Sequence, residues 1–146
     1  ILATKGTLNS ELFYNTASSF TNVEILEQIG HGLVQLIENG NIDTPEMLVL
    51  LKSYLKPMIE QNIDYLVLGC SHYPYLIPQI KKIIPSNIKI IDSGEAVAKQ
   101  TKNILNKNNL LHLKNNKVSN VFYSNVNSDV LNTILGNRYS IIEQDF

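Results

Sequence analysis

The pattern of apolar and polar positions predicts short strands that alternate with helices. Residues 45–61 give the clearest helix, since Pro45 suits a first turn and apolar side chains recur every three or four positions. Further helices are predicted from Asn9 or Ser10 and over residues 33–38, 76–84, 92–105 and 128–135. Short apolar runs predict strands at residues 1–3, 23–26, 65–68, 88–91, 121–124 and 139–142. This alternation is typical of an α/β fold with a largely parallel sheet flanked by helices.

Three details of the connections follow from residue type. Residues 4–7 are predicted to form a short turn-like loop, and residues 106–120, rich in Asn and Lys, a solvated connection. Asp92 followed by Glu95 resembles a capping pair that opens a helix.

Composition narrows the class of protein. The chain has 146 residues, of which 44% are hydrophobic and 17% charged, as in a globular domain with its own core. A net charge of -1 without a Lys or Arg cluster argues against nucleic acid and against an anionic membrane surface as the main partner. No apolar run is long enough to span a membrane, and no signal peptide is visible. A single cysteine fits a reducing cytoplasm, and the strand pattern at residues 1–3, without an initiating Met, favours a piece of a longer protein.

The only cysteine, Cys70, stands where the apolar run of residues 65–68 gives way to a helical pattern. In parallel α/β folds ligands bind beyond the carboxyl ends of strands, so this thiol is a candidate catalytic group at a substrate site. The alternative is that Cys70 is a small buried apolar side chain. One cysteine and three scattered histidines provide no paired ligand motif, so we expect no metal site.

His72 follows Cys70 by two positions. If the chain stays extended past Cys70, the two side chains point to one face and the imidazole lies beside the thiol. The alternative is a histidine that caps the next helix.

Residues 68–74 resemble the second cysteine motif of the cofactor-independent glutamate racemases, in which threonine usually occupies position 71. Three more stretches follow in the order of that family, at residues 2–7, 36–40 and 91–98. Aspartate racemases of the same superfamily typically carry glutamate at position 72, so His72 favours the glutamate branch.

The resemblance implies racemisation of L- and D-glutamate by two-base proton transfer without a cofactor, which supplies D-glutamate for peptidoglycan in the cytoplasm. A thiol with a reference pKa of about 8.5 suits one of the two acid/base roles, and Cys70 is the candidate. In the family the second cysteine lies in an Asn-Thr-Ala-type loop of an N-terminal lobe. Residues 15–18 have a similar composition, but they lack cysteine and lie in a helical pattern, so we treat the likeness as coincidence.

The resemblance also assigns roles to five residues around Cys70. It implies that His72 and Glu38 assist catalysis, and that Ser71, Thr4 and Thr7 contact the substrate glutamate. From the residues alone, the two threonines could equally be backbone partners in a turn, and Glu38 a solvated charge at a helix end.

The resemblance further divides the chain into two parts. Residues 1–93 match the second lobe of a two-lobed racemase, and residues 94–146 would complete the absent first lobe. The chain alone is therefore expected to be inactive, and the enzyme is expected to be a homodimer. Apolar side chains of the last segment should be exposed or should rest on another copy of the chain, among them Val121, Phe122, Leu131 and Ile141. The alternatives are another amino-acid racemase of the superfamily, such as one for aspartate, and a non-catalytic amino-acid-binding module.

Overall fold

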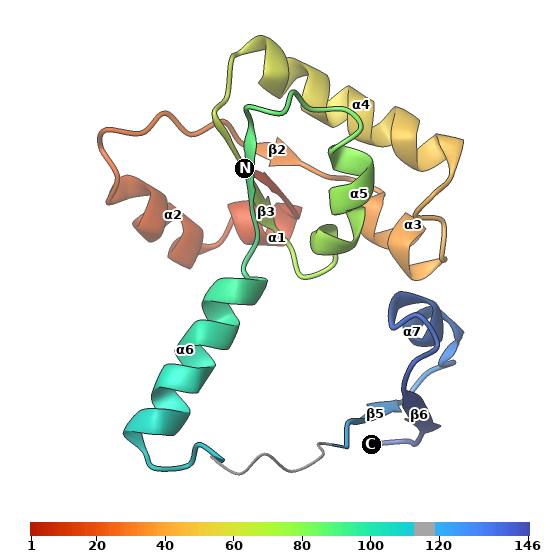
Figure 1. Ribbon diagram of the computed structural model, residues 1–146. Coiled ribbons are helices and arrows are strands. Elements are labelled where there is room, and N and C mark those ends of the chain that lie inside the picture. Colours follow the sequence, from red (N-terminus) through yellow and green to blue (C-terminus); the bar gives the residue numbers. More distant parts are fainter. Residues whose placement is uncertain (113–118) are drawn as a thin grey trace.

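Four short strands form a parallel sheet in the computed structural model, which describes residues 1–112 and 119–146 (Figure 1). The strands are β1 (Leu2–Ala3), β2 (Gln28–Ile29), β3 (Tyr65–Gly69) and β4 (Lys89–Ile91), in the order β2-β1-β3-β4. All of these pairs are parallel. The α/β class with a parallel sheet, predicted from the alternation of elements, is confirmed.

The position of β2 corrects one prediction. The apolar run at residues 23–26 was the expected strand, but the pairing partner of β1 is Gln28–Ile29. Backbone bonds from Gln28 N to Ile1 O and from Gly30 N to Ala3 O, both 2.9 Å, set this register. Pairing with the central strand therefore decides the position of β2, and the local apolar run does not.

Side-chain caps explain where the first helices begin. Thr4 accepts a hydrogen bond from Thr7 N and opens α1 (Lys5–Leu8), so the predicted loop at residues 4–7 is wrong. Ser10, one of the two predicted caps, accepts from Phe13 N and opens α2 (Glu11–Ser18). Thr44 does the same for α4 (Pro45–Glu60), which carries Pro45 in its first turn as predicted.

The core lies between one face of the sheet and the helices α3 (Leu33–Glu38) and α4. The helix α4 buries Met47, Leu51, Leu55 and Met58, which recur at helical spacing. Alternate residues of β3 face this layer, and they belong to one continuous apolar cluster with side chains of α3 and α4; its buried members include Leu2, Leu33, Ile37, Leu66, Leu68, Leu76 and Ile80.

The chain after Cys70 forms less regular helix than expected. A 3₁₀ turn η1 (Tyr73–Leu76) leads into α5 (Ile77–Ile80), whereas the apolar spacing predicted one helix over residues 76–84. Prolines at positions 74 and 78 lack the N–H that a continuous helix requires, so the turns are short. After β4, α6 (Gly94–Lys107) begins beside Asp92, whose carboxylate accepts from Gly94 N at 2.7 Å, while Glu95 pairs with Lys99 along the helix.

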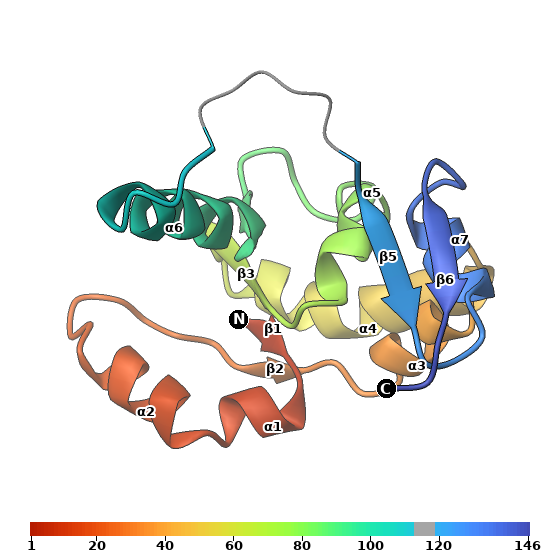
Figure 2. The same ribbon diagram turned by 90° about the horizontal axis from the view of Figure 1, so that it is seen from below.

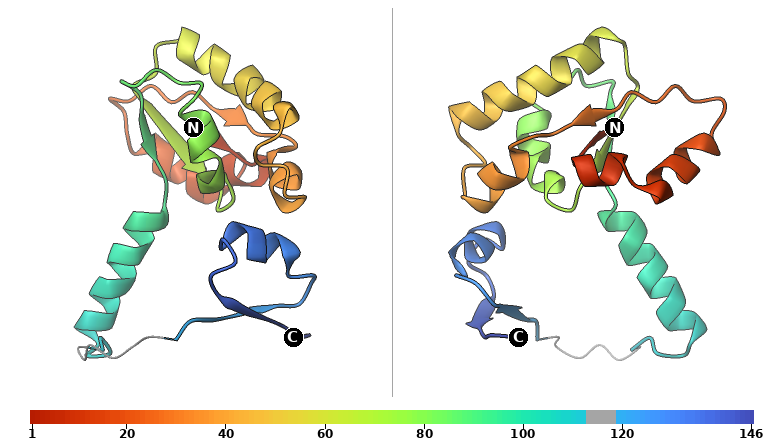
Figure 3. Two further views of the ribbon diagram at one scale, coloured as in Figure 1. Left: turned by 45° about the vertical axis from the view of Figure 1, so that its right-hand side comes forward. Right: turned by 180° about the vertical axis from the view of Figure 1, so that it is seen from behind.

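The last part of the chain forms a second, smaller sheet. Strands β5 (Val121–Ser124) and β6 (Ser140–Glu143) pair in parallel, with α7 (Asp129–Ile134) between them in sequence. Figure 2 shows these strands side by side, and Figure 3 shows α6 leading away from the four-stranded sheet. Of the side chains expected to be exposed, Val121 is 47% exposed, and Phe122, Leu131 and Ile141 are partly buried.

Two further observations complete the fold. The predicted connection over residues 106–120 starts inside α6, and residues 113–118 of it lie outside the described residues. Among the residues that the structure describes, no helix is long and apolar enough to cross a membrane.

Candidate active site

Three strands bring their carboxyl ends to one edge of the sheet. Ala3 of β1 lies opposite Ile29 of β2 and Gly69 of β3. The next residues along the chain, Thr4, Gly30 and Cys70, therefore meet at this edge. This is where ligands bind in parallel α/β folds.

The imidazole of His72 lies beside the half-buried thiol of Cys70. The distance from His72 Nδ1 to Cys70 Sγ is 3.9 Å, and that to the Ser71 hydroxyl is 3.4 Å. The chain does not stay extended to achieve this, because His72 has φ -82° and ψ -29°. Its ring makes no capping hydrogen bond to the following turn, so the interpretation as a helix cap is wrong.

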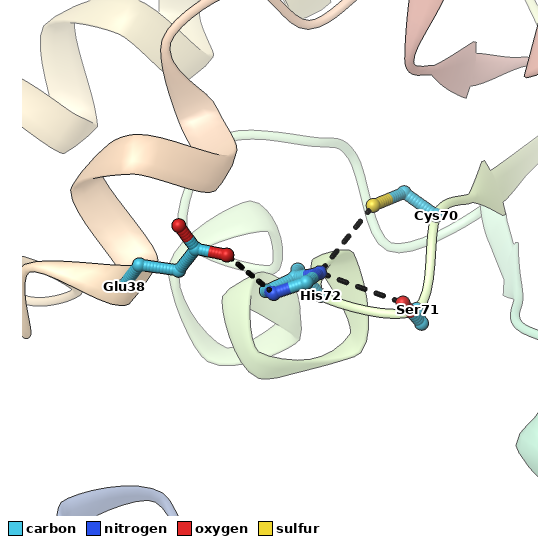
Figure 4. A network of polar contacts seen from close by, with 4 residues as sticks. All are labelled: Glu38, Cys70, Ser71 and His72. Atoms are coloured by element: carbon cyan, nitrogen blue, oxygen red, sulfur yellow. Dashed lines mark hydrogen bonds and ion pairs between the residues drawn. The ribbon is translucent and has the colours of Figure 1, made fainter. Parts of the chain in front are cut away.

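Glu38 reaches the other nitrogen of the same ring. It is the last residue of α3, and its Oε1 lies 3.2 Å from His72 Nε2 (Figure 4). A carboxylate here accepts from Nε2–H, which leaves Nδ1 of a neutral ring as an acceptor toward the thiol. The arrangement can therefore pass a proton between Cys70 and His72 while Glu38 fixes the orientation of the ring.

Thr4 and Thr7 lie at the same edge. Their hydroxyl oxygens are 2.9 Å apart, and Thr4 Oγ1 also accepts from Thr7 N at 3.2 Å. The Thr7 methyl carbon would stand 3.6 Å from a Cβ added to Gly69, the residue before Cys70. The structure brings the threonines next to the cysteine turn, and Thr4 also serves as the backbone cap that residue type alone suggested.

Sequence reasoning missed Tyr73. Its side chain is fully buried, and its hydroxyl donates to the carbonyl of Gly30 at 3.1 Å. Burial, and secondly the nearby charge of Cys70, raises the pKa of Tyr73 to about 12. An aromatic side chain directly after His72 was the available signal, but its partner lies far away in the sequence. The other two histidines, His31 and His112, are both exposed.

Two hollows lie away from this edge. One of about 720 Å³ is lined mainly by residues that precede β1, β2 and β3, with Tyr65 and Val67 of β3 and Ile91 of β4. One of about 730 Å³ lies along α5 and β4. Neither includes Cys70. Within residues 1–112 and 119–146, no group of three His, Cys, Asp or Glu side chains is placed to hold a metal ion.

Known proteins resemble this chain in sequence over most of its length. It is 41% identical over 112 residues to the glutamate racemase of Pseudomonas putida strain F1, and the match covers 76% of this chain and 42% of that relative. The chain thus spans about two fifths of the length of the curated relatives it matches. No protein-family model matches the sequence.

Solved structures resemble it over nearly the whole chain. A glutamate racemase isoform of Bacillus anthracis superposes with a TM-score of 0.82 at 27% identity, covering 99% of this chain and 56% of that one. The glutamate racemase of Francisella tularensis, solved in complex with D-glutamate, gives 0.81 at 26% identity with the same coverage. The resemblance first seen at residues 68–74 is confirmed.

Proposed function

The chain belongs to the glutamate racemase family, and we propose that it supplies one of the two proton-transfer groups for the cofactor-independent racemisation of glutamate. The observation that carries the proposal is the line of side chains from Cys70 through His72 to Glu38 at the ligand-binding edge of a parallel sheet.

Racemisation requires one group to remove the α-proton and another to deliver a proton to the opposite face. In one direction the Cys70 thiolate takes the α-proton and becomes a thiol, and a second group protonates the other face of the carbanion. In the reverse direction the Cys70 thiol gives its proton. By the family resemblance, the second group is a cysteine of the first lobe, and Cys70 is the only cysteine among these 146 residues.

The neighbours of Cys70 have distinct roles in this proposal. His72 Nδ1 exchanges a proton with the thiol, and Glu38 orients the ring through Nε2. The hydroxyls of Ser71, Thr4 and Thr7 hold the α-carboxylate and α-amino group of glutamate. Support comes from their position at one edge, with Ser71 adjacent in sequence to the thiol and the threonines on the neighbouring strand end.

The proposal extends to the whole protein. Residues 1–93 form the second lobe, residues 94–146 complete the first lobe, and the enzyme works as a homodimer in the cytoplasm to supply D-glutamate for peptidoglycan. The cleft between the lobes holds the substrate. The 146-residue chain alone then neither racemises glutamate nor binds it tightly.

The test uses the protein expressed from its complete reading frame, with each enantiomer of glutamate in deuterated water. Cys70→Ala should abolish racemisation in both directions, because one base cannot invert the centre, while exchange at one face survives. His72→Asn should slow proton transfer far more from one enantiomer than from the other. The exposed His112→Asn is the matched control and should leave both rates unchanged.

Four outcomes would overturn the proposal in distinguishable ways. Full racemisation by Cys70→Ala would remove the two-base role of the thiol. Faster turnover of aspartate than of glutamate would place the chain with another racemase of the superfamily. Binding of an amino acid without any exchange would show a binding module. Turnover by the 146-residue chain alone would instead require both bases to lie within it.

A further inference from the structure

One peptide group joins the elements that carry the site. Gly30 N donates to Ala3 O of β1 at 2.9 Å, which fixes the residue to the central sheet. Its carbonyl accepts from Leu33 N at 3.4 Å, in the first turn of α3, and from the Tyr73 hydroxyl at 3.1 Å. Gly30 therefore connects the sheet, the start of α3 and the turn η1.

The two connected elements present the two ends of the Glu38–His72 contact. Glu38 ends α3, and His72 immediately precedes η1. Their side chains are 58% and 34% exposed, and an ion pair that open to water contributes little by itself. The contact cannot hold the two elements together, so the spacing between them has to come from the buried structure beneath.

Tyr73 is the buried part that spans this spacing. Its N donates to Cys70 O at 3.2 Å, which closes the turn that carries His72, and its hydroxyl reaches across to Gly30. A Cβ at position 30 would overlap that hydroxyl and would stand 2.7 Å from Leu33 Cδ1. Only glycine permits this close approach, and the side chain of Tyr73 is fully buried, so the hydrogen bond forms without competition from water.

We propose that Tyr73 is a positioning residue: through its hydrogen bond to Gly30 it sets the distance between Glu38 on α3 and His72 beside the thiol. The inference rests on the proposed function for its meaning in catalysis. Its test does not, because the geometry of the site can be measured in this chain without turnover.

The test uses the only cysteine of the chain as a probe. Alkylation of Cys70 by iodoacetamide under native conditions is compared for the unsubstituted chain, Tyr73→Phe, Glu38→Gln and the double variant. Glu38→Gln removes the carboxylate, and Tyr73→Phe removes its alignment with the His72 ring. Each should slow the alkylation of Cys70 several-fold, toward the rate of His72→Asn. In the Tyr73→Phe background, Glu38→Gln should have little further effect, because the two side chains act through one contact.

Tyr54→Phe is the matched control. The Tyr54 hydroxyl donates to His31 O at 2.8 Å, the carbonyl next to that of Gly30, but it comes from α4, which carries none of the site residues. Both Phe variants lose one hydrogen bond from a tyrosine hydroxyl to a backbone carbonyl, an exposed bond for Tyr54 and a buried one for Tyr73. Only Tyr73→Phe should alter the alkylation rate and the nuclear Overhauser contacts between the His72 ring and the Glu38 side chain. Circular dichroism checks that both variants fold.

Several results would overturn the inference. One is equal effects of the two Phe variants on alkylation, which would reduce Tyr73 to a general contributor to stability. Another is an undiminished effect of Glu38→Gln in the Tyr73→Phe chain. A third is no effect of Glu38→Gln in the unsubstituted chain, since nothing would then depend on the alignment. If Tyr73→Phe fails to fold, Gly30→Ala, whose added methyl displaces the Tyr73 hydroxyl, takes its place and should give the same loss of coupling.

The racemase assay separates this inference from the proposed function. With the complete protein, Tyr73→Phe should lower kcat on the order of 10-fold to 100-fold with little change in KM, because the acid/base groups are misaligned while the substrate contacts remain. Suppose that Glu38→Gln slows alkylation in the unsubstituted chain but not in the Tyr73→Phe chain, and that the complete unsubstituted protein does not racemise glutamate. The positioning role of Tyr73 is then retained, and the proposed function is removed.

Discussion

Residues 1–91 and residues 92–146 are built from the same elements, yet only the first set has a core. Every buried side chain among the described residues lies between Leu2 and Ile88. Strands pair in parallel in both parts. Parallel strands are normally covered on both faces, and β5 and β6 leave Val121, Tyr123 and Ile142 between 41% and 54% exposed. The comparison teaches that the same local pattern forms strands with or without a cover, and that the cover decides which side chains are removed from water.

The helices of the two parts show the same contrast. In α4, four side chains at helical spacing are buried against the sheet. In α6 no side chain is buried, and Val97 and Ile104 are 60% and 48% exposed. The exposed pair Glu95–Lys99, with 2.6 Å between Oε1 and Nζ, supports α6 locally, and such pairs contribute only a few tenths of a kcal/mol. This open face agrees with the proposal that residues 94–146 pack on another lobe.

The largest expected effect comes from a matched pair of truncations in these helices. Leu51→Ala removes a fully buried side chain of α4 and should lower the free energy of unfolding by about 2–5 kcal/mol. Ile104→Ala removes a half-exposed side chain of α6 and should change it by less than about 1 kcal/mol. Urea unfolding of both variants measures the difference. Equal losses would mean that α6 is buried in solution and would break the comparison.

The sequence predicted the elements of both parts because periodicity is a local property. The cap at Ser10, Pro45 in the first turn of α4 and the strand before Cys70 all follow from residues within a few positions of one another. The predicted strand at residues 23–26 failed because pairing with β1, a property of the fold, selected Gln28–Ile29. The prediction of one helix over residues 76–84 was wrong because it gave more weight to the apolar spacing than to the two prolines at positions 74 and 78.

The candidate site shows the same limit. Residue type and the family resemblance indicated Cys70, His72 and Glu38, and the structure brings them into contact. The backbone route was different, since a turn at His72 places the ring beside the thiol, and an extended strand does not. Tyr73 was missed because its role depends on Gly30, and no spacing rule connects an aromatic residue to a carbonyl on another strand.

A second prediction sharpens the comparison from the core side. Since the folded pKa of Tyr73 is about 12 and the unfolded value about 10, the unfolded state loses this proton first as the pH rises. The protonated Tyr73 hydroxyl therefore makes its full contribution to the free energy of unfolding below about pH 10. This contribution is lost between about pH 10 and 12, at up to about 1.4 kcal/mol per pH unit. Urea unfolding across this range should show a shallower decline for Tyr73→Phe than for Tyr54→Phe or the unsubstituted chain. Identical slopes in all three would contradict the prediction.

The smallest expected effect concerns the part without a core. Ser128 N donates to Glu143 Oε1 at 2.9 Å, which joins the start of α7 to β6 and lowers the pKa of the Glu143 carboxyl. A lowered folded pKa stabilises this contact above the usual Glu range, and the stabilisation is lost as the pH falls through the folded value. Amide hydrogen exchange, corrected for intrinsic rates, should therefore show protection at Ser128 declining in acid while that at Leu66 in the core is retained. Glu143→Gln keeps an acceptor oxygen but cannot titrate, so its Ser128 protection should be independent of pH in this range, and Glu60→Gln, on the exposed end of α4, serves as the control. If the amide of Leu66 loses its protection at the same pH as that of Ser128, the two parts unfold as one unit. The difference in burial then does not divide the chain into parts of unequal stability.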